Sequence, residues 1–179
     1  MVLLIPLFAA CASSSGTSTS ARPATQMVGG EGIGSLILAG NGGSDVQKLA
    51  YTADAVWRAL PSVFDSLAIP LNSVDPTTKE IGNSALKTRV RLGKVYLSRY
   101  LDCGTTQIGP NADNYDVVLT VLSRVVAEGT GASKLTTTVQ AQARPATYNQ
   151  AYNACSSKGL IEGRIIELLT AALSKPPTR

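Results

Sequence analysis

Residues 115–144, YDVVLTVLSRVVAEGTGASKLTTTVQAQAR, decide the fold. The second half alternates strictly, and one set of alternate positions holds Leu135, Thr137, Val139, Ala141 and Ala143. Such alternation is typical of a strand with one face buried and one face in water. The glycine-rich residues 128–132 predict a turn, so residues 115–126 and 134–144 should form an antiparallel hairpin. The first strand is apolar on both faces, which indicates a central place in the sheet.

Two stretches that flank this hairpin have the apolar spacing of helices. In residues 45–68 the spacing of three, four or seven is made by Leu49, Val56, Leu60, Val63 and Leu67. Pro61 interrupts this helix and should kink it or split it in two. On the same helix face Trp57 and Phe64 are interpreted as core residues.

The second helix closes the chain. Ser156 or Ser157 is its expected N-cap, and Pro176 and Pro177 should end it. Its apolar stripe consists of Ile161, Ile165, Leu168, Leu169 and Ala172. Further short strands are expected at residues 35–39, 80–81 and 86–92. The predicted fold class is α+β: an antiparallel sheet with an N-terminal kinked helix and a C-terminal helix packed on it, in a helix-grip-like order.

The length of 179 residues and the 44% hydrophobic content favour one globular domain, placed at residues 33–175 with a short tail at 176–179. The chain has no histidine, which removes the commonest general base and metal ligand. Residues 84–87 match S-x-x-K without partner motifs, and a calcium-like loop at residues 111–116 lacks the final glutamate. Glu162 has no second carboxylate at a fixed spacing. We therefore expect no catalytic residue, no metal site and no cofactor.

Residues 1–10, MVLLIPLFAA, form an apolar run about half as long as a membrane-spanning helix. Such a run is typical of a cleaved signal peptide. Residues 11–32 are rich in Ser, Thr and Gly, which is the composition of a flexible tether. About twenty such residues span roughly 25 Å, so the domain should work close to its membrane.

The end of the apolar run, residues 7–11 with the sequence LFAAC, resembles the lipobox of bacterial lipoproteins. The resemblance implies that Cys11 is lipidated, that the membrane is reached through this lipid, and, by analogy, that the protein faces the periplasm from the outer membrane. No basic residue precedes the run, because Val2 follows Met1 directly. An upstream start codon is therefore one alternative, and a chance apolar N-terminus with a buried cysteine is another.

The remaining cysteines, Cys103 and Cys155, form an even pair, and an exported location favours a disulfide between them. By position this bond should clamp the closing helix to the sheet. It would close a loop of about fifty residues and stabilise the domain by roughly 4 kcal/mol.

The formal net charge is +4, and the densest basic group contains Lys87, Arg89, Arg91 and Lys94. The alternate positions 87, 89 and 91 would share one face of a strand. This face, or an exposed edge of the sheet, is the candidate binding surface. The basic face suits an anionic lipid or glycan, and the alternative is a plain exposed strand face. Nucleic acid is not an expected partner.

The order helix, antiparallel strands, helix faintly resembles the repeated domains of the accessory lipoproteins of the outer-membrane β-barrel assembly machine. We predict a non-catalytic envelope lipoprotein whose domain binds another envelope component, either a protein or the cell wall. The alternative is a carrier of a small apolar ligand between helix and sheet, and an enzyme is third. The oligomeric state stays open.

Overall fold

The computed structural model describes residues 43–175 of the chain. In chain order the elements are β1 (Gly43–Leu49), α1 (Ala53–Ser66), β2 (Ser73–Asp75), β3 (Glu80–Arg89), β4 (Arg91–Leu92), β5 (Val95–Tyr96), the 3-10 helix η1 (Leu97–Arg99), β6 (Leu101–Asp102), β7 (Thr105–Thr106), β8 (Gly109–Pro110), α2 (Asn111–Asn114), β9 (Tyr115–Ala127), β10 (Ser133–Pro145), β11 (Asn153–Ser157) and α3 (Leu160–Leu173).

The predicted hairpin is confirmed as β9 and β10, two strands of 13 residues each. They pair without a register shift from Tyr115 opposite Pro145 to Ala127 opposite Ser133. A backbone hydrogen bond of 3.0 Å from the Glu128 amide to the Ala132 carbonyl closes the turn. The strict alternation in the sequence therefore corresponds to one long, regular ladder.

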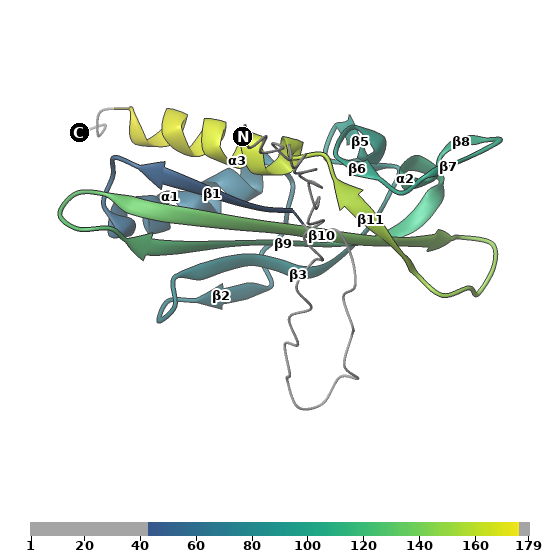
Figure 1. The fold of residues 1–179 in the computed structure, drawn as a ribbon, viewed down its shortest axis with the longest axis horizontal. Helices are drawn as coiled ribbons and strands as arrows, with labels where there is room; N and C mark the ends of the chain where they lie inside the picture. Colours follow the sequence, from purple (N-terminus) through teal and green to yellow (C-terminus); the bar gives the residue numbers. More distant parts are fainter. Residues whose placement is uncertain (1–42, 176–179) are drawn as a thin grey trace, which may run out of the picture.

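The sheet has the strand order β2-β3-β9-β10-β11-β6, and β1 also pairs with β10 (Figure 1). Every pairing within it is antiparallel. β1 occupies the first part of the outer edge of β10 and β11 occupies the second part, because their partners are residues 133–139 and 141–143. β9 lies between β3 and β10, which confirms its expected central place.

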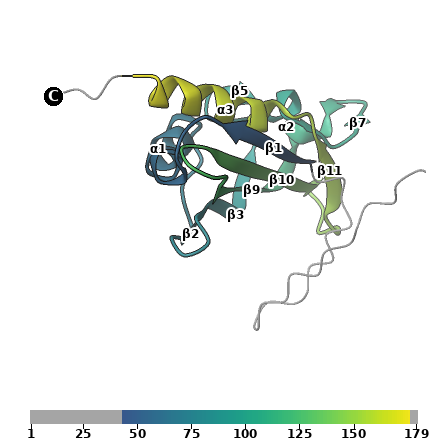
Figure 2. The ribbon, with the colours of Figure 1, turned by 60° about the vertical axis from the view of Figure 1, so that its left-hand side comes forward.

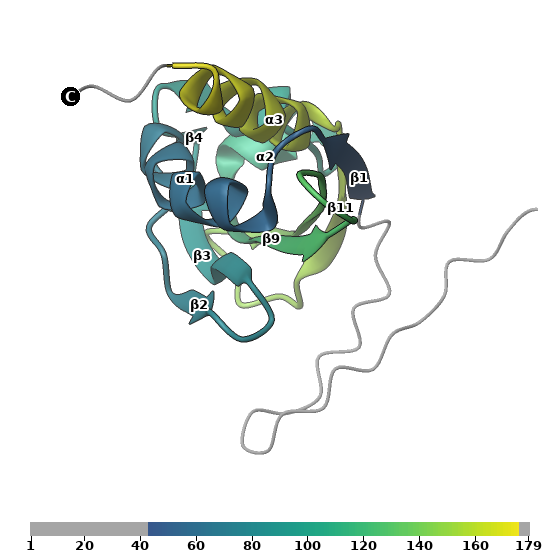
Figure 3. The ribbon, with the colours of Figure 1, turned by 90° about the vertical axis from the view of Figure 1, so that its left-hand side faces the viewer.

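Both long helices lie on the same face of the sheet, as the end-on view shows (Figures 2 and 3). Alternate side chains of β9 and β10 point toward them and are buried, so the alternation places the core between sheet and helices. The fully buried side chains of the core include Val56, Leu60 and Phe64 of α1, Leu119 and Leu135 of the hairpin, and Ile161, Ile165 and Leu169 of α3. Burying each of them contributes roughly 1.5–3 kcal/mol. The predicted fold class, α+β with an N-terminal and a C-terminal helix on an antiparallel sheet, is confirmed.

The helix predicted for residues 45–68 is wrong at its start. Residues 45–49 belong to β1, and α1 begins only at Ala53, where the Thr52 hydroxyl caps it by accepting a hydrogen bond from the Ala55 amide. Leu49 fits the apolar spacing of a helix, but it is instead the buried end of a strand that pairs with β10. A free edge on β10 outweighs the weak local preference of this stretch.

Pro61 does not split α1, which is one helix from Ala53 to Ser66. The proline removes one backbone donor. It lies on an exposed part of the helix, while Leu60, Val63 and Phe64 around it are buried. Burial of this apolar face keeps the helix continuous at the proline.

The start predicted for the closing helix is also wrong. Ser156 and Ser157 belong to β11, where they pair with Asp102 and Leu101 of β6. α3 is capped by Gly159, whose φ of 75° is favourable only for glycine. The strand expected at residues 35–39 and the terminal prolines lie outside the described residues. In the part of the chain that is described, no helix has the length and apolar character needed to cross a membrane.

Gly82 is a backbone position that only glycine can occupy. Its φ is 157°, and a Cβ built there would lie 2.0 Å from the Val121 carbonyl oxygen of the neighbouring strand. We predict that Gly82→Ala lowers the free energy of unfolding by about 3 kcal/mol, because β3 must move away from β9. Urea unfolding measures this.

Gly129 is the matched control. It has a φ of 67°, but an added Cβ would meet nothing within 4 Å. Gly129→Ala should cost only the conformational term of about 1 kcal/mol. Equal losses in the two variants would contradict the close approach of β3 to β9.

Candidate functional site

The predicted binding face begins on β3. Opposite β9, Leu86 and Thr88 face the buried Leu119 and Val117, so they point toward the core. Lys87 and Arg89 point away from it and are exposed. The structure therefore places these two cations side by side on the face of the sheet that α1 and α3 do not cover.

Arg91 does not continue that strand. Val90 has a φ of 67°, so β3 ends at Arg89 and the chain turns into the small hairpin of β4 and β5. The expected strand over residues 86–92 is thus wrong at Val90, which is exposed instead of facing inward. The guanidinium of Arg91 lies 4.0 Å from the centroid of the Tyr96 ring and donates a hydrogen bond to the Lys94 carbonyl.

The positive charge of the chain is concentrated here. Five of the sixteen Lys and Arg residues and none of the twelve Asp and Glu residues lie between positions 81 and 101. We call these five residues the basic segment: Lys87, Arg89, Arg91, Lys94 and Arg99. All five are exposed, and within residues 43–175 none lies within 4.0 Å of a carboxylate oxygen.

Apolar side chains are exposed among these cations. Val90 is 37% exposed, Val95 38% and Tyr96 46%. The β4–β5 hairpin is anchored to the core by the side chains of Leu92 and Leu97, which are 5% and 0% exposed. A backbone hydrogen bond of 2.9 Å from the Leu97 amide to the Val90 carbonyl closes its base. The hairpin therefore combines positive charge with apolar and aromatic groups and is fixed to the core on its inner side.

Cys103 and Cys155 are joined by a disulfide. Cys155 lies in β11, and the pairing of Ser156 with Asp102 puts Cys103 directly opposite it, next to the end of β6. The bond therefore joins two neighbouring strands, and the expectation that it would clamp the closing helix to the sheet is wrong. It fixes the segment that contains η1 and β6 to the sheet.

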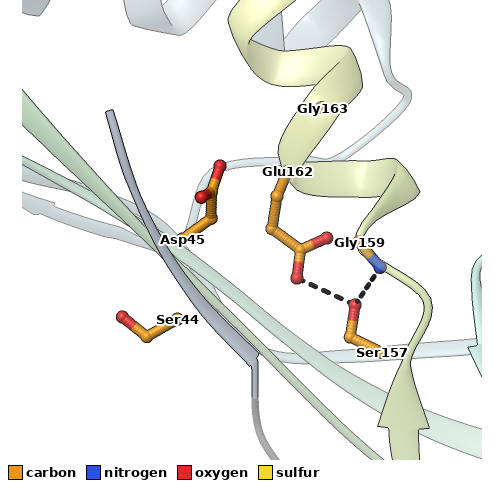
Figure 4. Close-up of a pocket in the computed structure, with 6 residues that line it drawn as sticks. All are labelled: Ser44, Asp45, Ser157, Gly159, Glu162 and Gly163. Carbon is orange, nitrogen blue, oxygen red and sulfur yellow. Dashed lines mark hydrogen bonds between the residues drawn. The ribbon is translucent and has the colours of Figure 1, made fainter. Parts of the chain in front are cut away.

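A second feature is an open pocket of about 370 Å³ between β1, the end of β11 and the first turn of α3 (Figure 4). It is lined by Ser44, Asp45, Ser157, Gly159, Glu162 and Gly163. β1 and β11 share one edge of β10, and the pocket lies beside the start of β1 and the end of β11.

Glu162 is only 3% exposed and takes part in a short hydrogen-bond network. The Ser157 hydroxyl donates to Glu162 Oε1 at 2.8 Å and accepts from the Gly159 amide at 3.2 Å (Figure 4). Glu162 Oε2 is buried and has no hydrogen-bond partner among the described residues. A carboxylate in the first turn of a helix is stabilised by the helix dipole, so the arrangement fits an N-terminal cap.

The pocket has a second acidic residue that no sequence motif indicates. Glu162 has no carboxylate partner at a fixed spacing in the sequence, but the structure brings Asp45 to the same pocket from β1. No spacing in the sequence indicates this pair, because Asp45 is on β1 and Glu162 follows β11, and these two strands are brought together by separate pairings with β10. Within residues 43–175, no three His, Cys, Asp or Glu side chains gather closely enough to hold a metal ion. Cys11, the predicted lipidation site, lies outside the described residues.

No family model matches this chain, and no curated protein matches it. Among solved structures it is similar to a conserved protein from Geobacillus kaustophilus, with 13% sequence identity and a TM-score of 0.31. The match covers 74% of this chain and 89% of that chain. At this identity and TM-score the likeness carries no argument about function.

The disulfide should contribute strongly to stability because it links residues 52 positions apart. We predict that the double substitution Cys103→Ala and Cys155→Ala lowers the free energy of unfolding by about 4 kcal/mol. The main reason is that the unfolded chain gains conformational entropy when the bond is absent. Urea unfolding with and without a reductant measures this. A reductant should destabilise the parent chain and leave the double variant unchanged. Equal stability of the two oxidised proteins would contradict the prediction.

Proposed function

We propose that this chain is a lipid-anchored protein of the bacterial envelope whose domain binds another envelope component through the basic segment. The observation that carries the binding part is the concentration of charge: the chain is net −1 outside positions 81–101 and +5 within them. Exposed cations with no carboxylate partner among residues 43–175 attract anionic partners over several ångströms.

The lipid anchor is supported by the lipobox-like residues 7–11 and by the Ser/Thr-rich stretch after Cys11. The Cys103–Cys155 disulfide is consistent with an exported location, since such bonds persist in oxidising compartments. Buried acyl chains contribute roughly 0.8 kcal/mol per methylene, so two or three chains hold a protein firmly to a leaflet.

The packing of the core favours a binding module over a carrier of an apolar ligand. The space between helices and sheet is occupied by large side chains that are 0–2% exposed, among them Phe64, Ile165 and Leu135. A carrier needs a cavity of several hundred Å³ in this place.

The anchor is tested by expressing the full chain, with any upstream start codon, in a bacterial host. We predict that the protein in the membrane fraction carries a lipid-sized mass increase that Cys11→Ser abolishes, because the thiol is the acylation site. Intact-protein mass spectrometry of both proteins measures this. Soluble proteins of equal mass would contradict the anchor.

The binding role of the basic segment is tested with the Cys11→Ser chain from the same bacterial host, because this chain has no lipid to hold it on the membrane. This chain should stay with washed envelopes at low salt, and K87Q/R89Q/R91Q should release it. The matched control K48Q/R58Q/K175Q removes the same charge from exposed residues elsewhere on the domain. Equal retention of the two triple variants would contradict a role for the basic segment.

A further inference from the structure

We infer that the partner of the basic segment is the anionic leaflet of the membrane in which Cys11 is anchored. This inference rests on the proposed anchor and identifies the partner of the proposed surface. The docking surface consists of the basic segment together with Val90, Val95 and Tyr96. The domain would lie against its own membrane with the β4–β5 hairpin toward the lipid headgroups.

The positive charge of the basic segment favours binding to an anionic leaflet. A Lys or Arg near an anionic leaflet contributes about 1 kcal/mol of binding, so several exposed cations together give substantial attraction. Two carboxylates lie beside the basic segment: Asp116 is opposite Arg89, and Asp113 accepts a hydrogen bond of 2.8 Å from the Ser98 amide. Lys94 lies at the turn of the β4–β5 hairpin, which is a separate two-stranded sheet.

The exposed apolar groups distinguish a leaflet from a soluble polyanion. A polyanion needs only the cations, whereas a membrane interface also accepts apolar and aromatic side chains between its headgroups. Tyr96 presents a ring with a polar tip, which suits the headgroup region. The Arg91 guanidinium above that ring, at 4.0 Å, keeps both groups on the same side of the hairpin.

The β4–β5 hairpin lies near the point where the tether enters the domain. Ser44, near the first described residue, lines the same pocket as Ser157. Ser157 pairs with Leu101 of β6, and the next residue, Lys158, donates through its Nζ to the Ser98 carbonyl of η1 at 2.7 Å. η1 follows β5 without a gap, and Figure 1 shows β5 and β6 beside the start of α3.

The tether therefore joins the domain near the end that carries the docking surface. An anchor that precedes β1 brings this end toward the leaflet. The disulfide at Cys103 and Cys155 fixes the same end to the sheet, so the surface is presented as a rigid body. A rigid surface binds with a smaller entropic cost than a mobile one.

The test uses the full chain with Cys11→Ser, so that only the protein surface can bind. Sedimentation with phosphatidylcholine vesicles is compared with sedimentation with vesicles that also contain phosphatidylglycerol. We expect binding only to the anionic vesicles, and weaker binding as salt increases. K87Q/R89Q/K94Q, which keeps the Arg91–Tyr96 contact, should weaken it about a hundredfold. The control K48Q/R58Q/K175Q should stay close to the parent chain.

Val95→Ser tests the apolar part without changing the charge. It should weaken vesicle binding about tenfold and leave retention on heparin unchanged. Thermal unfolding of each variant checks that the domain is still folded. Binding to heparin without binding to anionic vesicles would overturn the inference in favour of a soluble polyanion. Equal binding to neutral and anionic vesicles would also overturn it. Either outcome leaves the mass test of Cys11 and the envelope-retention test standing.

Discussion

The pairing of β9 with β10 is the interaction on which the other elements depend. β3 and then β2 attach to the free edge of β9, and β1 and β11 divide the free edge of β10 between them. β6 attaches to β11, so the insert with the β4–β5 hairpin is also held through this ladder and through the disulfide. The buried face of the hairpin, with Leu119 and Leu135, then forms the floor on which both helices pack.

The hairpin and the apolar faces of the two helices, but not the helix starts, were predictable because their signals are local. Apolar residues at every second position over about a dozen residues predict a strand. They also specify its buried face, because shifting the strand by one residue would turn all of them toward the solvent. β1 was not predictable, because Leu49 has the spacing of a helix and its strand exists only through the edge of β10. The break at Val90 was also hidden, because a positive φ at a β-branched residue has no sequence signal.

The candidate site divides in the same way. The charges at positions 87–94 lie close together in the sequence, so a basic cluster was predictable, but the departure of Arg91 from the strand was not. The expected disulfide pairing is present, but its role could not be inferred without knowing that β6 pairs with β11. The pocket that Asp45 and Glu162 share, and the closeness of the start of the domain to η1, depend on pairings between distant strands. Such contacts have no local pattern.

The proposed membrane contact combines a lipid anchor, a short tether and a basic, partly apolar surface near the end of the domain where the tether enters. This end should face the membrane, and amide hydrogen exchange tests this orientation most directly. Exchange of the acylated chain on vesicles that contain phosphatidylglycerol is compared with exchange of the Cys11→Ser chain in buffer. We predict slower exchange in residues 90–99 and unchanged exchange in β2, which pairs with residues 80–82 at the other end of β3. Unchanged exchange in residues 90–99, or protection confined to β2 and α1, would contradict it.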